Sequence, residues 1–162
     1  MKMKKHLAIL FLSAACSLFA QKYLYTIELS PENLADIDPR QNTVLKTVEN
    51  KKAIFVTKGN SIWLDLTLEK CLGEEITVTF RYKAVNPEKP SKKAEASLRY
   101  AKGDVYCECT VVKRIKLAPG KEWQTATCTG IFPKKMEEAM IVFSTDDNNF
   151  YVTDIKVHKK GK

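Results

Sequence analysis

Hydrophobic and polar residues alternate along most of the chain, which is the pattern of β-strands that bury one face. The alternation is clearest between Ser61 and Ala84, in two runs that begin at Ile62 and Ile76 and flank Gly73. No segment shows a convincing amphipathic helical period. The pattern predicts strands over residues 23–29, 53–57, 62–68, 76–82, 96–101, 106–117, 122–132, 139–144 and 150–157.

Many short strands separated by Gly, Pro and Asn turns predict an all-β fold, namely an antiparallel β-sandwich. About 140 residues suffice for one domain with a single core. We therefore expect residues 21–162 to form a single domain. Within it, residues 33–51 give no clear pattern, and their role is not predicted.

Residues 1–20 have the composition of a secretory signal peptide, with three lysines, an apolar run at 7–12 and small residues before Ala20. The apolar run is too short for a comfortable transmembrane helix. We expect cleavage after Ala20 and a secreted or periplasmic protein that does not span the membrane. The alternative is a lipoprotein that is anchored through Cys16.

Four cysteines remain after residue 20, and cysteines in exported proteins favour disulfides. Cys107 and Cys109 lie two apart on one predicted strand, so they face the same way and are poorly placed to bond one another. One of them, or Cys71, is expected to pair with Cys128, and the connectivity stays open. A zinc site is not expected, because His158 is the only histidine after residue 20 and no CxxC pair occurs.

The formal charge of +8 falls to +5 when the lysines of residues 1–20 are removed. Lysines scattered over strand ends and loops favour solubility and protect sheet edges. The same charge would also attract anionic polysaccharide or the cell envelope. Without a recognisable motif in an exported chain, nucleic acid binding is not expected.

Catalysis is not expected either. The chain has no nucleophile elbow and no serine or cysteine that the sequence pairs with a histidine. Glu108 and Asp146 are a pair of carboxylates that could in principle act as acid and base in glycoside hydrolysis. That role requires a suitable distance between them and a raised pKa in one of them. The sequence provides no support for either condition.

The phase of the strands predicts a binding surface. If the leucines of the 62–68 run are buried, Trp63 and Asp65 point together to the other face. If Cys109 and Val111 are buried on the 106–117 strand, Tyr106 and Glu108 are turned outward. Aromatic rings pack on the apolar faces of sugars, while carboxylates bond to their hydroxyl groups.

From Ala53 to Val157 the chain resembles the carbohydrate-binding modules of families 4, 9 and 22, which are jelly rolls of the galactose-binding-domain-like type. This resemblance implies a jelly-roll fold and non-catalytic binding of a polysaccharide or glycan. The matching pieces are VTKGNSIW (56–63), EEITVTFRYKA (74–84), GDVYCECTVVKRIKLAPGKEWQT (103–125) and NNFYVTDIKV (148–157).

The resemblance also implies functional residues. Trp63 and Tyr106 stand where xylan-binding members present rings to the sugar, and Ser144 replaces a usual acidic residue, which predicts a different ligand preference. Trp123 stands at a packing position. The expected ligand-binding residues are Trp63, Tyr106, Asp65, Arg99, Glu108 and Ser144.

A structural calcium ion is a further implication of the resemblance, since such modules often hold one between the first and last strands. Glu28 and Asp154 are the expected ligands, because hard cations require several oxygen atoms. However, Thr153 and Leu29 depart from the residues that usually accompany such a site. Surface charge is the alternative role for both acids.

Other interpretations of the same residues remain open. An outward Trp63 could be covered by residues 33–51 or could contact a partner protein. The alternative function is a structural or protein-interaction module of the bacterial cell envelope that has no sugar site. It is favoured because the chain carries no enzyme that a glycan-binding module would assist.

Overall fold

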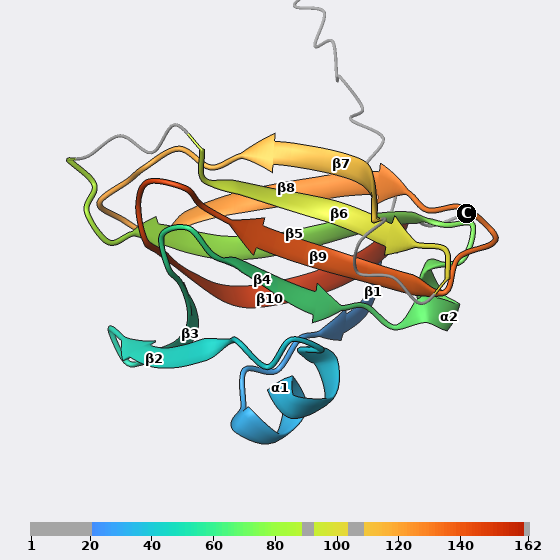
Figure 1. The fold of residues 1–162 in the computed structure, drawn as a ribbon, viewed down its shortest axis with the longest axis horizontal. Coiled ribbons are helices and arrows are strands. Elements are labelled where there is room, and N and C mark those ends of the chain that lie inside the picture. Colours follow the sequence, from blue (N-terminus) through green and yellow to red (C-terminus); the bar gives the residue numbers. More distant parts are fainter. Residues whose placement is uncertain (1–20, 89–92, 104–108, 161–162) are drawn as a thin grey trace, which may run out of the picture.

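The structure is a computed structural model that describes residues 21–88, 93–103 and 109–160, so the expected signal peptide and Cys16 lie outside it. The described residues form ten strands and two short helices (Figure 1). In chain order these are β1 (Gln21–Thr26), α1 (Pro31–Ile37), β2 (Val44–Val48), β3 (Lys51–Val56), β4 (Ser61–Asp65), α2 (Leu68–Cys71), β5 (Glu75–Ala84), β6 (Glu95–Ala101), β7 (Thr110–Lys116), β8 (Gln124–Ile131), β9 (Glu138–Ser144) and β10 (Phe150–Lys160).

The strands form two antiparallel sheets that pack face to face, which confirms the predicted all-β sandwich (Figure 1). One sheet has the order β2-β3-β10-β5-β8, with β1 also paired to β10. The other sheet has the order β4-β9-β6-β7. Neighbours in each sheet are mostly distant in sequence, so long-range pairing holds the sandwich together.

The main core lies between the two sheets and contains the inward-facing residues of nearly every strand. Phe80 of β5 and Phe143 of β9 meet at its centre, with ring centroids 4.9 Å apart and planes at 78°. Edge-to-face contacts of this kind stabilise aromatic pairs beyond their burial. Full burial of each such side chain contributes roughly 1.5–3 kcal/mol.

The two alternating runs around Gly73 lie in different sheets. β4 ends at Asp65, and α2 then carries the chain across to β5 of the opposite sheet. Leu68, which we predicted to be in a strand, is therefore the first residue of α2. Gly73 has a φ of +70°, a left-handed conformation that a glycine adopts without strain.

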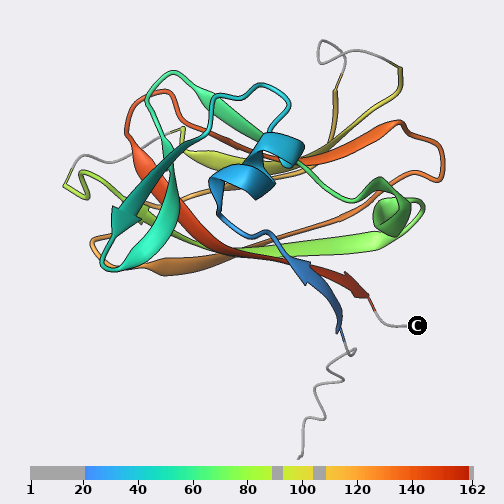
Figure 2. The same ribbon diagram turned by 90° about the horizontal axis from the view of Figure 1, so that it is seen from below.

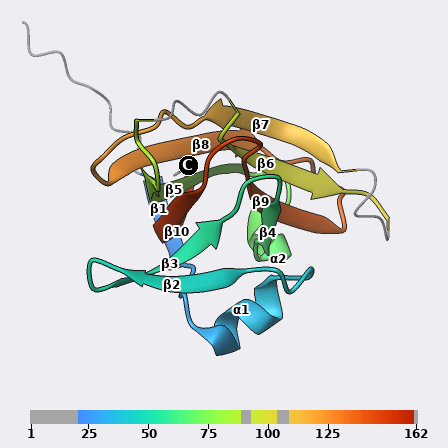
Figure 3. The ribbon, with the colours of Figure 1, turned by 60° about the vertical axis from the view of Figure 1, so that its left-hand side comes forward.

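Residues 33–51 fold into α1 and β2, neither of which the hydrophobic pattern predicted. Ser30 caps α1, because its Oγ accepts a hydrogen bond from the Asn33 amide at 3.2 Å, and Pro31 fits the first turn. Leu34 is the buried residue of this helix. A helix of seven residues with a single buried residue gives almost no periodic pattern of hydrophobic positions in the sequence. Figure 2 looks onto α1 and the neighbouring β2–β3 hairpin, and Figure 3 shows β2 and α1 on the same side of the sandwich.

The expected disulfide to Cys128 is absent. Cys71 in α2 and Cys128 in β8 are both buried free thiols that belong to the main core. Burial raises the pKa of the Cys71 thiol to about 12 and also raises that of Cys128. These two cysteines act as small apolar core residues, while Cys107 lies outside the described residues.

Candidate functional site

The four-stranded sheet presents one face to the core and the other, which we call the outer face, away from it. The antiparallel register aligns Asp65 of β4 with Met140 of β9 and Arg99 of β6 across this face. Ser144 of β9 lies two rows away on the same face, opposite Ser61 and Glu95. The four predicted ligand-binding residues that the structure describes therefore share one surface: Trp63, Asp65, Arg99 and Ser144.

Trp63 has the outward phase that we predicted, but its exposure was predicted wrongly. The ring packs in a small cluster with Ala101, Met140 and Val142 on the outer face and is only 6% exposed. Its Nε1 donates to Ser61 Oγ at 2.8 Å. Neighbouring side chains therefore cover a residue that strand alternation correctly turned away from the core.

Two guanidinium groups lie on the Trp63 ring. The central carbon of Arg40 is 4.0 Å from the ring centroid, and that of Arg99 is 5.0 Å away. Both distances allow a cation–π interaction. Arg40 follows α1, so residues 33–51 do cover Trp63, as one of our alternatives had it.

Hydrogen bonds hold the segment that carries Arg40 against β4. Asn42 Nδ2 donates to the Ser61 carbonyl at 3.0 Å. The amide of Thr43 donates to Asp38 Oδ2 at 2.8 Å, which closes the turn around Arg40. These two hydrogen bonds therefore position the loop from which Arg40 reaches over Trp63.

Basic side chains gather on β6 and β7. Arg99 Nε donates to Ser97 Oγ at 2.9 Å, and Arg99 forms no ion pair with any described residue. Burial lowers the pKa of Arg99, the positive charge of Arg114 lowers it further, and the negative charge of Glu95 opposes the shift. Arg114 Nε lies 3.3 Å from Glu95 Oε1, to which Ser144 Oγ also donates at 3.5 Å.

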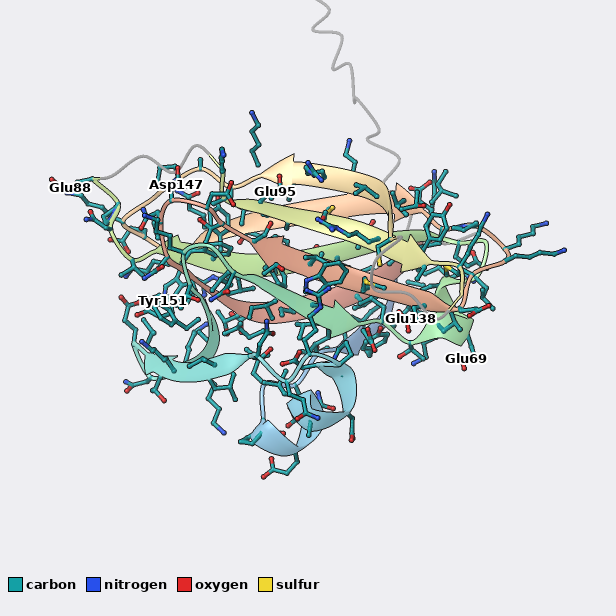
Figure 4. The ribbon with its side chains drawn as sticks, in the orientation of Figure 1. Glu69, Glu88, Glu95, Glu138, Asp147 and Tyr151 are labelled. Carbon is teal, nitrogen blue, oxygen red and sulfur yellow. The ribbon has the colours of Figure 1, made fainter. Side chains whose placement is uncertain are left out.

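Acidic side chains gather on the β4 and β9 side of the same sheet, where Asp65 lies in the row of Arg99 but two strands away. Asp65, Glu138 and Asp38 each have one buried oxygen atom without a hydrogen-bond partner among the described residues. Burial raises the pKa of Asp65 from 3.8 to about 6, and repulsion from Glu138 and Asp38 acts in the same direction. Figure 4 shows Glu95 and Glu138 towards different ends of the sheet.

The argument that pointed Tyr106 and Glu108 outward does not hold. Cys109 packs against the outer-face cluster, and Val111 pairs with Arg99, whose side chain lies on that same face. The cause is a β-bulge at Val112, which shifts the register of β6 and β7 and reverses the facing that alternation gave to Val111 and Cys109. Tyr106 and Glu108 themselves lie outside the described residues.

The proposed calcium ligands do not fit a calcium site. Asp154 Oδ2 lies 3.0 Å from Lys51 Nζ and 3.6 Å from a nitrogen of Arg81, so two cations already neutralise it. Glu28 is exposed. No group of three or more acidic, histidine or cysteine side chains suited to a metal ion occurs in the described part of the chain.

Sequence reasoning did not identify Arg40, Glu95 or Glu138 as members of this surface. The alternation of β6 and β9 carries a signal for Glu95 and Glu138, since they share the phase of Arg99 and Ser144. Arg40 gave no such signal, because it lies in a loop. Its position depends on how α1 packs against β4.

The fold is similar to that of carbohydrate-binding modules in solved structures, which confirms the jelly-roll type. A xylan-binding domain of family 22 has a TM-score of 0.60 at 14% identity, covering 87% of this chain and 97% of that one. A tandem of two family 22 modules from Paenibacillus barcinonensis has a TM-score of 0.63 at 14% identity, covering 86% and 50%.

The family 22 and GH10 modules of Clostridium thermocellum endo-1,4-β-D-xylanase 10B, complexed with xylohexaose, have a TM-score of 0.58 at 14% identity. The match covers 78% of this chain and 26% of that one, so this chain spans about a quarter of the xylanase fragment. At such identities the similarity establishes the shared fold. No protein-family model and no curated protein matches the sequence.

In the part of the chain that the structure describes, no helix has the length and apolar character needed to cross a bilayer.

Proposed function

We propose that this protein is a non-catalytic module that binds a polysaccharide or glycan on the outer face of its four-stranded sheet. The observation that carries the proposal is the convergence of Trp63, Asp65, Arg99 and Ser144 on that one face. The similarity of the fold to carbohydrate-binding modules supports the same conclusion.

The outer face offers the chemistry that sugar recognition needs. Guanidinium groups donate in fixed directions, whereas hydroxyl and carboxylate groups accept from the hydroxyl groups of a sugar ring. The guanidinium groups of Arg40 and Arg99 both lie against the Trp63 ring. In the proposed complex the sugar bonds to these guanidinium groups first, and it stacks on Trp63 only where Arg40 is displaced.

Intrinsic fluorescence tests the proposal, because the chain has two tryptophans, of which Trp63 lies in β4 of one sheet and Trp123 immediately precedes β8 of the other. A Trp123→Phe variant leaves Trp63 as the reporter, and a Trp63→Phe variant leaves Trp123 as the matched control. Neutral and acidic polysaccharides are added to each, and binding is measured independently by retardation in affinity gels. We expect retardation together with a change in emission in the Trp63 reporter alone.

Retardation with a change in the Trp123 reporter alone would move the binding site to the six-stranded sheet. Absence of retardation by every polysaccharide would reject the glycan-binding function. Release of reducing sugar by the purified protein would reject the non-catalytic assignment.

A second candidate function is a structural or protein-interaction module of the cell envelope. The low exposure of Trp63 favours it, because a ring beneath two arginines has little surface left for a sugar. If no polysaccharide in the affinity gels retards the protein, we prefer this function to glycan binding.

Export from the cytoplasm is also part of the proposal, supported by the composition of residues 1–20. The mass of the protein recovered from producing cells tests it. Cleavage after Ala20 predicts a chain that begins at Gln21, whereas a lipid-modified chain that begins at Cys16 would support the anchored alternative. An uncleaved chain in the cytoplasm would reject both.

A further inference from the structure

We propose that the glycan bound on the outer face carries carboxylate groups, as polymers of uronic acids do, and that Arg99 binds such a carboxylate with Arg114 beside it. The inference rests on the proposed glycan-binding function. It adds the charge of the ligand and the half of the face on which that charge binds.

Arginine side chains from three separate segments approach one another here. Arg99 comes from β6, Arg114 lies on β7 opposite Ser97, and Arg40 reaches in from the loop after α1. Arg114 and Arg40 are close enough to repel the charge on Arg99, and Glu95 offsets part of that repulsion. Like charges brought together by the fold favour a bound anion.

Arg99 has hydrogen-bonding capacity to spare. Its Nε donates to Ser97 Oγ, while its terminal nitrogens donate to no described residue. The guanidinium lies half-buried against Trp63 and forms no ion pair within the described residues. Withdrawing a cation from water without a partner is costly. A planar carboxylate matches the guanidinium fork and would add a charged partner to the ring and hydroxyl contacts that Arg99 makes within the described residues.

The acidic side chains on β4 and β9 limit where such a ligand would lie. The carboxyl groups of Asp65 on β4 and Glu138 on β9 would disfavour a ligand carboxylate on that part of the face. Glu95, the acid near the basic half, already contacts Arg114 at 3.3 Å. The charged groups of the ligand should therefore bind over β6 and β7, which are separated from Asp65 by β9 and lie beside Glu95 (labelled in Figure 4).

The test compares uronic acid polymers with their neutral counterparts. Polygalacturonate, alginate and glucuronoxylan are each run in affinity gels beside the carboxyl-reduced form of the same polymer. Arg99→Gln removes the proposed carboxylate contact, and Arg99→Lys keeps the charge but loses the planar fork. Lys156→Gln is the matched control, because it removes one exposed positive charge from β10 of the other sheet. Thermal unfolding establishes that each variant is folded.

We expect at least one acidic polymer to bind about tenfold more tightly than its reduced form. Arg99→Gln should remove this preference, Arg99→Lys should retain part of it, and Lys156→Gln should leave it unchanged. An equal loss in Arg99→Gln and Lys156→Gln would show unspecific attraction by net charge and would overturn the inference. Equal binding of acidic and reduced polymers would overturn it while leaving the glycan-binding function intact. No binding of any polymer would overturn both.

Discussion

The guanidinium carbon of Arg40 lies 4.0 Å from the centre of the Trp63 ring. The two residues come from different parts of the fold, since Arg40 follows α1 and Trp63 lies in the middle of β4. The contact covers the aromatic residue that the strand pattern turned away from the core. It therefore determines whether a ligand meets a ring or an arginine.

Removal of this cover should change the environment of Trp63. In a Trp123→Phe background, Arg40→Gln should shift the fluorescence emission of Trp63 to longer wavelength, because the indole ring gains contact with water. A loss of about 0.5–1 kcal/mol of stability should accompany the change. Emission spectra and urea unfolding measure the two effects.

The matched control is Arg81→Gln in a Trp63→Phe background. The Arg81 guanidinium lies 5.7 Å from the Trp123 ring, which is only half-buried, so a smaller shift is expected. An unchanged Trp63 spectrum in the Arg40 variant would mean that the other side chains around the ring are sufficient to cover it.

Trp63 should also contribute to stability. Trp63→Ala should lower the free energy of unfolding by about 2–4 kcal/mol, because it empties the cluster that the ring forms with Met140 and Val142. Trp63→Phe fills most of that volume and should cost less. Urea unfolding of both variants provides the measurement, and a loss below about 1 kcal/mol in Trp63→Ala would contradict a packing role.

Asp65 should make stability depend on pH. Its pKa of about 6 in the folded protein lies above its ordinary value of 3.8, so the folded state binds the proton more tightly than the unfolded state. The contribution of Asp65 to the free energy of unfolding therefore decreases as the pH rises from about 4 to about 6 and is constant above that. Partial exposure limits the effect to about 1 kcal/mol.

Asp65→Asn should remove this dependence. The variant should match the wild type near pH 4 and exceed its stability by about 1 kcal/mol above pH 6. Urea unfolding of the variant and the wild type at several pH values between 4 and 7 gives the difference in their free energies of unfolding. Groups that titrate equally in both proteins cancel in this difference. A variant that is less stable than the wild type at pH 7 would show that the carboxylate has a favourable partner.

Cys71 and Cys128 should resist alkylation in the folded protein. Burial shields both thiols and raises their pKa, so little thiolate is present at pH 8. Iodoacetamide followed by peptide mass spectrometry should find both residues unmodified in buffer and both modified in guanidinium chloride. A disulfide that includes Cys128 under non-reducing conditions would contradict the arrangement described above.

Much of the framework could be predicted from the sequence. Alternation located nine strands and gave the correct phase for β4, with Leu64 in the core and Trp63 on the outer face. Phase within one strand is a local property, because successive side chains point to opposite faces. The grouping of Trp63, Asp65, Arg99 and Ser144 on one face follows from it once the strands are paired.

Only the tertiary structure decided how those residues are surrounded. The bulge at Val112 arises from pairing between β6 and β7, and it reversed the facing that alternation had given to Cys109 and Val111. The cover over Trp63 depends on α1 and on Arg40, which have no periodic signal. Alternation fixes the direction of a side chain, whereas its exposure depends on packing between segments that are distant in the chain, and no single segment encodes such contacts.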